Sequence, residues 1–172
     1  ADHPATLPLL RRCCVMKVFI SHKQEDSLYA KLVKRQLDLL NVDSYLDVLD
    51  TSINGGGEAL TDHIKDQLNS CTDIIVVMSE ATKYSWWVPF EIGMAAQIDM
   101  PTATYLTSSV GLPDYLTYWP RLKSISDVAT YVTVRNEVSD RLRNRHPYSY
   151  PQPMYRPYET ATFYDEVKRK LR

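Results

Sequence analysis

Short apolar runs alternate along the chain with segments of helical periodicity, beginning at residue 16. The run "DIIVVMS" at residues 73–79 is continuously apolar between its first and last residues, which is typical of a strand buried on both faces of a parallel sheet. "VFIS" at residues 18–21 is a similar, shorter run between polar residues. The whole pattern predicts strands at residues 18–21, 44–49, 73–79, 101–106 and 121–125.

The first segment of helical periodicity is residues 26–40. Its apolar positions recur three or four residues apart, with charges between them, as in an amphipathic helix. We expect one face of this helix to carry Leu28, Leu32, Val33, Leu37 and Leu40.

Further helices are predicted between the later strands. Residues 58–69 place Leu60, Ile64 and Leu68 four positions apart, and residues 86–97 form another apolar segment. We expect Ser126 to be the N-cap of a helix that runs to residue 144, because a serine hydroxyl can accept a bond from the first free amides of a helix. The remaining segments are an extended proline–tyrosine connector at 146–158 and a final short helix at 160–171.

Strands separated by helices of this length predict an α/β protein with three layers. Right-handed crossovers place helices on both faces of a doubly wound parallel sheet of about five strands. Ligands in such folds bind beyond the carboxyl ends of the strands. Ser21 and His22 follow the first strand, residues 50–57 the second, and residues 79–91 the third. We expect these three segments to converge on one crevice.

Composition and charge narrow the class of protein. The 172 residues suit one domain with a single core, and we expect it to span residues 16–172. Residues 1–15 precede the methionine that opens the first strand, so we interpret them as a flexible leader or a segment added to the natural chain. A net charge of −1 argues against a broad nucleic-acid surface, and no apolar run approaches the length of a membrane span.

The cysteines and histidines point to no disulfide framework and no metal. Cys13, Cys14 and Cys71 fit neither paired disulfides nor a CxxC metal site, and they favour a reducing, cytoplasmic location. His63 and the other histidines lack metal-ligand spacing. We therefore assign no metal and no cofactor.

Several classes of protein that share this fold are excluded, because the chain lacks their motifs. The chain has no GxGxxG fingerprint, no GxxxxGK[ST] loop and no GxSxG elbow. The first strand does not end in acidic residues, as a phosphate-accepting receiver domain would require.

Two stretches resemble the Toll/interleukin receptor (TIR) domain family. "VFISHKQED" is similar to the first box of the family, and "GGGEALTDHIKDQLNSCTDIIVVMSEATKYSWWVPFEIGMA" is similar to its central stretch. The second contains S-x-W-x-x-x-E, matched by Ser85, Trp87 and Glu91. The resemblance extends over residues 17–96 and implies a flavodoxin-like fold.

The resemblance also implies an activity. Many bacterial, plant and some animal TIR domains cleave the nicotinamide–ribose bond of NAD⁺, to ADP-ribose or to cyclic ADP-ribose isomers that signal in antiphage defence. The glutamate that matches Glu91 is their catalytic residue, and NAD⁺ is a substrate rather than a cofactor. Such sites are commonly completed by a neighbouring protomer, so the resemblance implies a homo-oligomer and, in this setting, a separate effector protein that responds to the product.

The remaining site residues are expectations of the same kind. Ser21 and His22 would contact the dinucleotide, and Ser85 and Trp87 would lie beside Glu91. The family's glycine-bearing loop closes over the substrate and mediates assembly, which implicates Asp50, Gly55 and Gly56. Here the chain departs from the family pattern, because three consecutive glycines replace the commoner proline–glycine type.

One carboxylate can be sufficient to catalyse cleavage of the nicotinamide–ribose bond. Nicotinamide leaves as a neutral molecule and needs no general acid, unlike the leaving group of an ordinary glycoside. Positive charge then grows on the ribose, and a fixed anion in a water-poor site stabilises it. Trp87 precedes Glu91 by four residues, so both lie on one helical face, and its ring suits packing against ribose or a base. Pro89 is tolerated in a first turn, whose amides lack helical partners.

Other interpretations of these residues remain open. A glutamate near a helix start is usually a solvated residue favoured by the helix dipole, adjacent tryptophans usually pack in a core or an interface, and Ser21 and His22 can belong to a turn that caps the next helix. The glycine run can be a simple flexible turn. As a whole protein, the chain could instead be a non-catalytic interaction module, or a nucleoside N-glycosidase or deoxyribosyltransferase-like hydrolase.

Overall fold

A computed structural model describes residues 16–46, 56–145 and 157–172 of the chain. Its strands are β1 (Lys17–Ser21), β2 (Asp43–Leu46), β3 (Asp73–Met78), β4 (Thr102–Leu106) and β5 (Arg121–Leu122). Its α-helices are α1 (Ser27–Leu39), α2 (Gly56–Asn69), α3 (Trp87–Gln97), α4 (Ile125–Arg145) and α5 (Pro157–Lys170). Three short 3-10 turns, η1 (Gln24–Asp26), η2 (Thr82–Tyr84) and η3 (Asp114–Leu116), were not predicted from the sequence.

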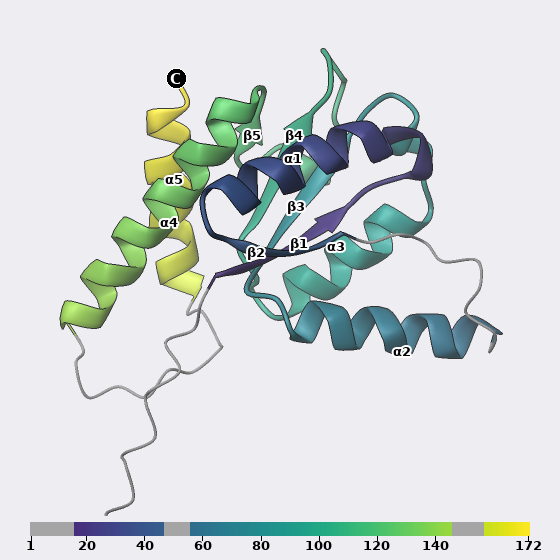
Figure 1. The fold of residues 1–172 in the computed structure, drawn as a ribbon, viewed down its shortest axis with the longest axis horizontal. Helices are drawn as coiled ribbons and strands as arrows, with labels where there is room; N and C mark the ends of the chain where they lie inside the picture. Colours follow the sequence, from purple (N-terminus) through teal and green to yellow (C-terminus); the bar gives the residue numbers. More distant parts are fainter. Residues whose placement is uncertain (1–15, 47–55, 146–156) are drawn as a thin grey trace, which may run out of the picture.

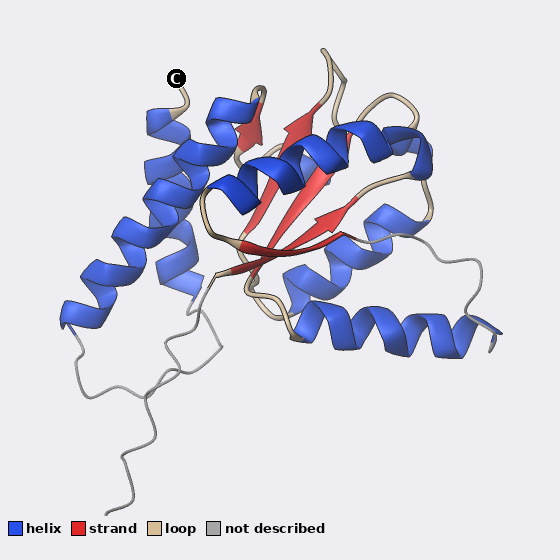
Figure 2. Cartoon of the chain, in the orientation of Figure 1, coloured by secondary structure: helices blue, strands red, loops and turns tan. Residues whose placement is uncertain are grey.

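The strands form one five-stranded parallel sheet in the order β2-β1-β3-β4-β5. Helices lie on both sides of it (Figures 1 and 2), with α1 and α4 over one face and α2 and α3 over the other. Right-handed crossovers dictate this division, because the chain winds outward from β1 to one edge and then, from β3, to the other. The predicted flavodoxin-like α/β fold is confirmed.

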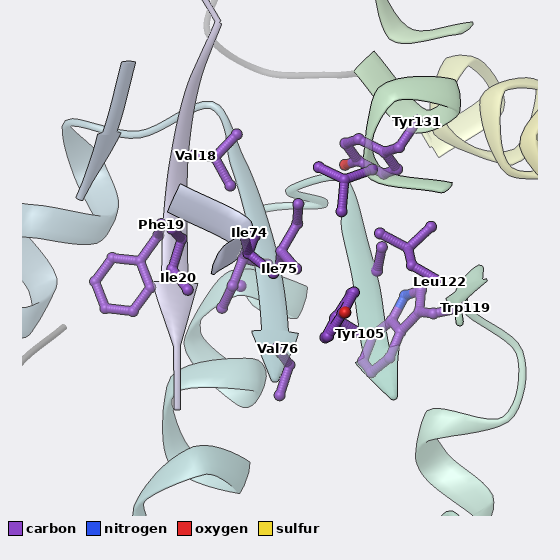
Figure 3. Packing of buried hydrophobic residues seen from close by; sticks show 14 of the residues in the cluster. Val18, Phe19, Ile20, Ile74, Ile75, Val76, Tyr105, Trp119, Leu122 and Tyr131 are labelled. Carbon is purple, nitrogen blue, oxygen red and sulfur yellow. The ribbon is translucent and has the colours of Figure 1, made fainter. Parts of the chain in front are cut away.

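The core lies along the central strands. All six residues of β3 are buried, and four of the five in β1, as expected for strands covered on both faces. Figure 3 shows Phe19, Ile20 and Ile75 on these strands, and Tyr131 of α4 at another part of the same buried cluster. These strands are therefore rigid supports for whatever follows their carboxyl ends.

The predicted apolar face of α1 is confirmed for Val33 and Leu37 and is wrong for Leu28 and Leu32. The residues that α1 buries are Ala30, Val33 and Leu37, whereas Leu28 is 69% and Leu32 42% exposed. Positions 30, 33 and 37 share one side of a helix of 3.6 residues per turn, and positions 28 and 32 fall on the opposite side. Apolar residues on both sides of this helix made the periodicity ambiguous.

The start of α4 also differs from the prediction. Ser126 lies inside the helix, and Ser124 is the capping residue: its hydroxyl accepts a bond from the amide of Asp127 at 3.3 Å, while the Asp127 carboxylate accepts one from the amide of Ser124 at 3.1 Å. This reciprocal pairing is a capping box. It ends β5 at Leu122, three residues earlier than predicted.

Two other helices start before their predicted first residues. α2 begins at Gly56 and not at residue 58. The amides of a first helical turn have no partners within the helix, and this turn tolerates glycine. α5 begins at Pro157, within the predicted connector, and proline is favoured in the first turn. Among the described helices, none combines the length and apolar character needed to span a membrane.

Candidate active site

The carboxyl ends of β1 and β3 meet at the centre of the sheet. β1 pairs with β2 on one side and with β3 on the other, so the direction of winding reverses between β1 and β3. Such a switch point separates the two following connections and is where ligands bind in open α/β sheets. The β1–α1 connection starts at Ser21, and the β3–α3 connection leads to Glu91.

Glu91 and Ser21 are in direct contact. The side chain of Glu91, on the second turn of α3, is fully buried, and its Oε2 accepts a short hydrogen bond from the Ser21 hydroxyl. A carboxylate taken out of water must be hydrogen-bonded, because its desolvation is costly. The structure thus joins two predicted site residues that are 70 positions apart.

His22 is buried beside this pair and faces the start of α1. Its Nε2 lies 3.3 Å from the Ser27 hydroxyl, and that hydroxyl donates to the carbonyl of Gln24 at 2.6 Å. Because the one hydroxyl hydrogen of Ser27 is used, Nε2 is the donor in the contact with His22. His22 therefore ties the end of β1 to the first turn of α1.

Ser85 and Trp87 shape the start of α3. The Ser85 hydroxyl accepts bonds from the amides of Trp87 at 3.2 Å and Val88 at 3.4 Å, which are the first two residues of the helix. The half-buried Trp87 ring packs against Phe90 with centroids 5.3 Å apart. Its indole Nε1 is buried without a hydrogen-bond partner among the described residues. Buried donors of this kind are rare and call for an explanation.

The third predicted segment is only partly described. Gly56 is the first residue of α2, so it belongs to a helix and not to the predicted loop. Asp50 and Gly55 lie outside the described residues.

Sequence reasoning missed a buried aspartate in the β1–α1 connection. Asp26 is 4% exposed, and its Oδ2 accepts hydrogen bonds from the hydroxyl of Ser79 at 2.6 Å and from that of Thr82. Ser79 had one signal in the sequence, its place directly after a buried strand. Asp26 had none that set it apart from the other acidic residues.

Surface grooves lie away from Glu91. One of about 480 Å³ runs between α2 and α3, past Leu68, Phe90 and Met94. Another of about 350 Å³ lies between the end of α3 and α5, past Tyr118 and Tyr164. Neither is lined by Ser21, His22 or Glu91, and the Glu91 side chain is fully buried. Among the described residues, no cluster of His, Cys, Asp or Glu side chains could hold a metal ion.

A second fully buried carboxylate lies at the opposite end of the sheet. Asp73 opens β3 and forms an ion pair with Arg135 of α4 at 2.9 Å. Its carboxylate also accepts bonds from the Tyr131 hydroxyl at 2.9 Å and the Thr72 hydroxyl at 2.6 Å. Burial, followed by the charge of Asp73, raises the pKa of Tyr131 well above its usual value, so Tyr131 remains a neutral donor.

The fold and this strand-end pair define a flavodoxin-like α/β domain with a buried carboxylate at its switch point. A family model described as TIR domain matches residues 18–143, which include Glu91 and the five strands except for Lys17, the first residue of β1. The chain therefore belongs to the TIR domain family. A comparison with curated proteins finds none that matches it. Members of the family can be catalytic or non-catalytic.

Proposed function

We propose that this TIR domain cleaves the nicotinamide–ribose bond of NAD⁺, releasing nicotinamide together with ADP-ribose or a cyclic ADP-ribose isomer. The observation that supports this most directly is the Glu91 carboxylate, which is buried at the switch point and oriented by the hydroxyl of Ser21. A carboxylate held in this way is a preorganised negative charge in a medium of low polarity. Such a charge is worth most where positive charge develops during a reaction.

In the proposed reaction Glu91 stabilises the ribose cation as neutral nicotinamide departs. The electron pair of the glycosidic bond leaves with the nicotinamide nitrogen. A water or a hydroxyl of the same dinucleotide then forms a bond to the ribose carbon and releases its proton to the solvent. Attack by water gives ADP-ribose, whereas internal attack gives a cyclic isomer. Ser21 keeps the carboxylate in place and supplies no proton to the leaving group.

Trp87 is the proposed neighbour of the bound dinucleotide. It lies one helical turn before Glu91, and its buried Nε1 is a donor without a partner among the described residues. In this proposal the flat ring packs against ribose or a base, and the unsatisfied donor finds an acceptor on the substrate. Ser85 and His22 act at the edge of the site, together with Asp50 and Gly55 and with Gly56, the first residue of α2.

The burial of Glu91 sets a condition on turnover. Because the carboxylate is fully buried, and the two grooves lie elsewhere, NAD⁺ reaches it only after a local rearrangement. TIR domains generally self-associate or bind other TIR proteins, and we propose that self-association supplies this rearrangement. The product would then act in the cytoplasm as a signal to a separate effector protein, in bacterial antiphage defence.

A non-catalytic interaction module is the second candidate. Its support is a set of exposed aromatic residues before and within α3: Trp86 is 94% exposed, and Tyr84 and Phe90 are exposed as well. Exposed apolar surface of this kind marks contact sites. In that case Glu91 is a structural residue that binds α3 to β1.

The two candidates are separated by incubating concentrated protein with NAD⁺ and identifying products by chromatography and mass spectrometry. Nicotinamide release is expected from the wild type and not from Glu91→Gln. The mass of the second product distinguishes ADP-ribose from its cyclic form, which lacks one water. A wild type that leaves NAD⁺ intact, even when it is crowded or fused to an oligomerising partner, would favour the interaction module.

A further inference from the structure

We infer that Asp26 is a positioning residue for Glu91: it fixes the β3–α3 connection, and with it the start of α3, against the β1–α1 connection. This inference rests on the proposed NAD⁺ cleavage, because it concerns the geometry of the same site. Asp26 is five residues from Ser21 along the chain and is not itself in contact with Glu91 through any hydrogen bond that the structure shows.

The contacts of Asp26 join two segments that are far apart in sequence. One carboxylate oxygen, Oδ2, accepts from both Ser79 and Thr82, which lie 53 and 56 positions away. The side chain is nearly fully buried, and so is Thr82. Hydrogen bonds from hydroxyls to a buried carboxylate are strong and directional, so the turn at residues 79–82 is held in one position relative to η1.

That turn determines where α3 begins. The Ser79 hydroxyl also accepts bonds from the amides of Ala81 at 3.1 Å and Thr82 at 3.2 Å, so one side chain both shapes the turn and ties it to Asp26. The amide of Ser85 then donates to the carbonyl of Thr82 at 2.9 Å. Ser85 in turn caps the first amides of α3. Hydrogen bonds therefore connect Asp26 to the helix start at every step.

Two routes of contacts lead from Asp26 to Glu91. From Asp26 one branch leads through the turn and Ser85 to α3, and the other leads back along the β1–α1 connection to Ser21, which donates to Glu91. His22 and Ser27 brace the second branch. A closed path of this kind holds the carboxylate from both sides. Loss of Asp26 would remove the hydrogen bonds that tie the turn before α3 to the β1–α1 connection.

The test compares nicotinamide release by Asp26→Ala, Asp26→Asn and Thr82→Val with the wild type. In Asp26→Ala we expect kcat to fall by about 10- to 100-fold, the loss that a displacement of about 1 Å produces, with KM changed by less than about threefold. Asp26→Asn keeps an oxygen that accepts both hydroxyl bonds, so it should retain at least about a third of the wild-type kcat. Thr82→Val should be intermediate and add little to Asp26→Ala, as expected for partners in one contact.

Tyr131→Phe is the matched control, because it removes a buried hydroxyl–carboxylate bond at the far end of the sheet. It should leave kcat unchanged in a folded protein. The inference is overturned if Asp26→Ala turns over normally, if Asp26→Asn loses as much as Asp26→Ala, or if Tyr131→Phe of equal stability loses the same activity.

A second readout separates this inference from the proposed function. The indole N–H resonance of Trp87, assigned by its loss in Trp87→Phe, reports the position of the α3 start without any substrate. It should shift in Asp26→Ala and stay in place in Tyr131→Phe. If the wild type leaves NAD⁺ intact but the resonance shifts in Asp26→Ala, the proposed NAD⁺ cleavage is contradicted and the positioning role is supported. If the resonance does not shift in Asp26→Ala, the positioning role itself is contradicted.

Discussion

Two buried carboxylates, at opposite ends of the same sheet, have different surroundings. Asp73 lies at the amino end of β3, where Arg135 neutralises its charge and two hydroxyls complete its hydrogen bonds. Glu91 lies beyond the carboxyl ends of β1 and β3, on a helix, and accepts a bond from the neutral hydroxyl of Ser21. The first arrangement ties α4 to the sheet, and the second places a carboxylate where α/β folds bind ligands.

The difference shows that burial alone does not identify a site. Both carboxylates are fully buried, but an ion pair at the amino end of a strand serves stability, because its charges are satisfied within the protein. At the carboxyl end, the Glu91 carboxylate accepts a hydrogen bond from the Ser21 hydroxyl, and in the proposed function it stabilises the cation that forms in the reaction. The predictions below test this division of roles, from the largest expected effect to the smallest.

Asp73→Asn should give the largest loss of stability. It leaves the buried guanidinium of Arg135 facing a neutral amide, and breaking a buried ion pair in this way costs about 3–5 kcal/mol. Chemical denaturation of Asp73→Asn and Glu91→Gln side by side measures the difference in free energy of unfolding. Glu91→Gln, which can still pair with Ser21, should lose about 1 kcal/mol or less. If both variants lost the same free energy of unfolding, the two carboxylates would not differ in their contribution to stability.

Tyr131→Phe should have a smaller effect that depends on pH. At neutral pH it removes a hydrogen bond to a charged group, which costs about 1.5–3 kcal/mol. Burial raises the pKa of Tyr131 in the folded protein above the ordinary value of 10.0. Between the unfolded and folded values the unfolded state binds fewer protons, so this tyrosine lowers the free energy of unfolding by about 1.4 kcal/mol per pH unit as pH rises.

Denaturation curves recorded from neutral pH to above pH 10 check this expectation. The wild type should lose stability more steeply than Tyr131→Phe above the ordinary tyrosine pKa, and the two should converge. Curves that stay parallel over the alkaline range would mean that Tyr131 ionises as freely in the folded protein as in the unfolded chain.

Trp87→Ala should impair nicotinamide release more than Trp86→Ala does. Trp87 is half-buried, and its indole donor, one turn before Glu91, has no partner within residues 16–46, 56–145 and 157–172, whereas Trp86 is 94% exposed. We expect a loss of about tenfold in kcat/KM for Trp87→Ala, the scale of one aromatic or hydrogen-bonding contact. Trp86→Ala is the matched control and should change turnover little. The reverse order would place the substrate on the exposed ring.

Leu28→Gln combined with Leu32→Gln should have the smallest effect on stability, within about 0.5 kcal/mol, because both residues face away from the core. Leu37→Ala in the same helix is the contrasting variant, with an expected loss of about 2–5 kcal/mol from its fully buried position. Thermal denaturation and light scattering check both stability and self-association. A large loss of stability in the double variant would show that the exposed leucines are covered in solution.

The sequence was sufficient to predict the sheet and one contact of the candidate site. Continuous aliphatic runs predicted β1 and β3, and the strand-end rule predicted that Ser21 and the segment with Glu91 would meet, which they do. The face of α1 was not predictable from periodicity alone, since Leu28 and Leu32 are as apolar as the buried Leu37. Ser124 and Ser126 both resemble N-caps, and only the pairing of Ser124 with Asp127 distinguishes them.

The contacts of Asp26 were beyond the reach of sequence reasoning for a different reason. Its partners Ser79 and Thr82 lie more than fifty positions away, and local pattern carries no information about which polar residues meet across a sheet. The Asp73 cluster has the same character, because Arg135 and Tyr131 come from a helix that lies more than fifty positions beyond Asp73 in the sequence. Polar networks between distant segments therefore had to come from the structure.

The measurement that tests the central claim most directly is nicotinamide release from NAD⁺ by wild type, Glu91→Gln and Asp73→Asn, at a temperature where all three are folded. We predict that the wild type and Asp73→Asn release nicotinamide at similar rates per folded molecule, and that Glu91→Gln releases none. Turnover by Glu91→Gln at the wild-type rate, or loss of turnover in Asp73→Asn alone, would contradict the assignment of chemistry to the carboxyl end of the sheet and of stability to the other.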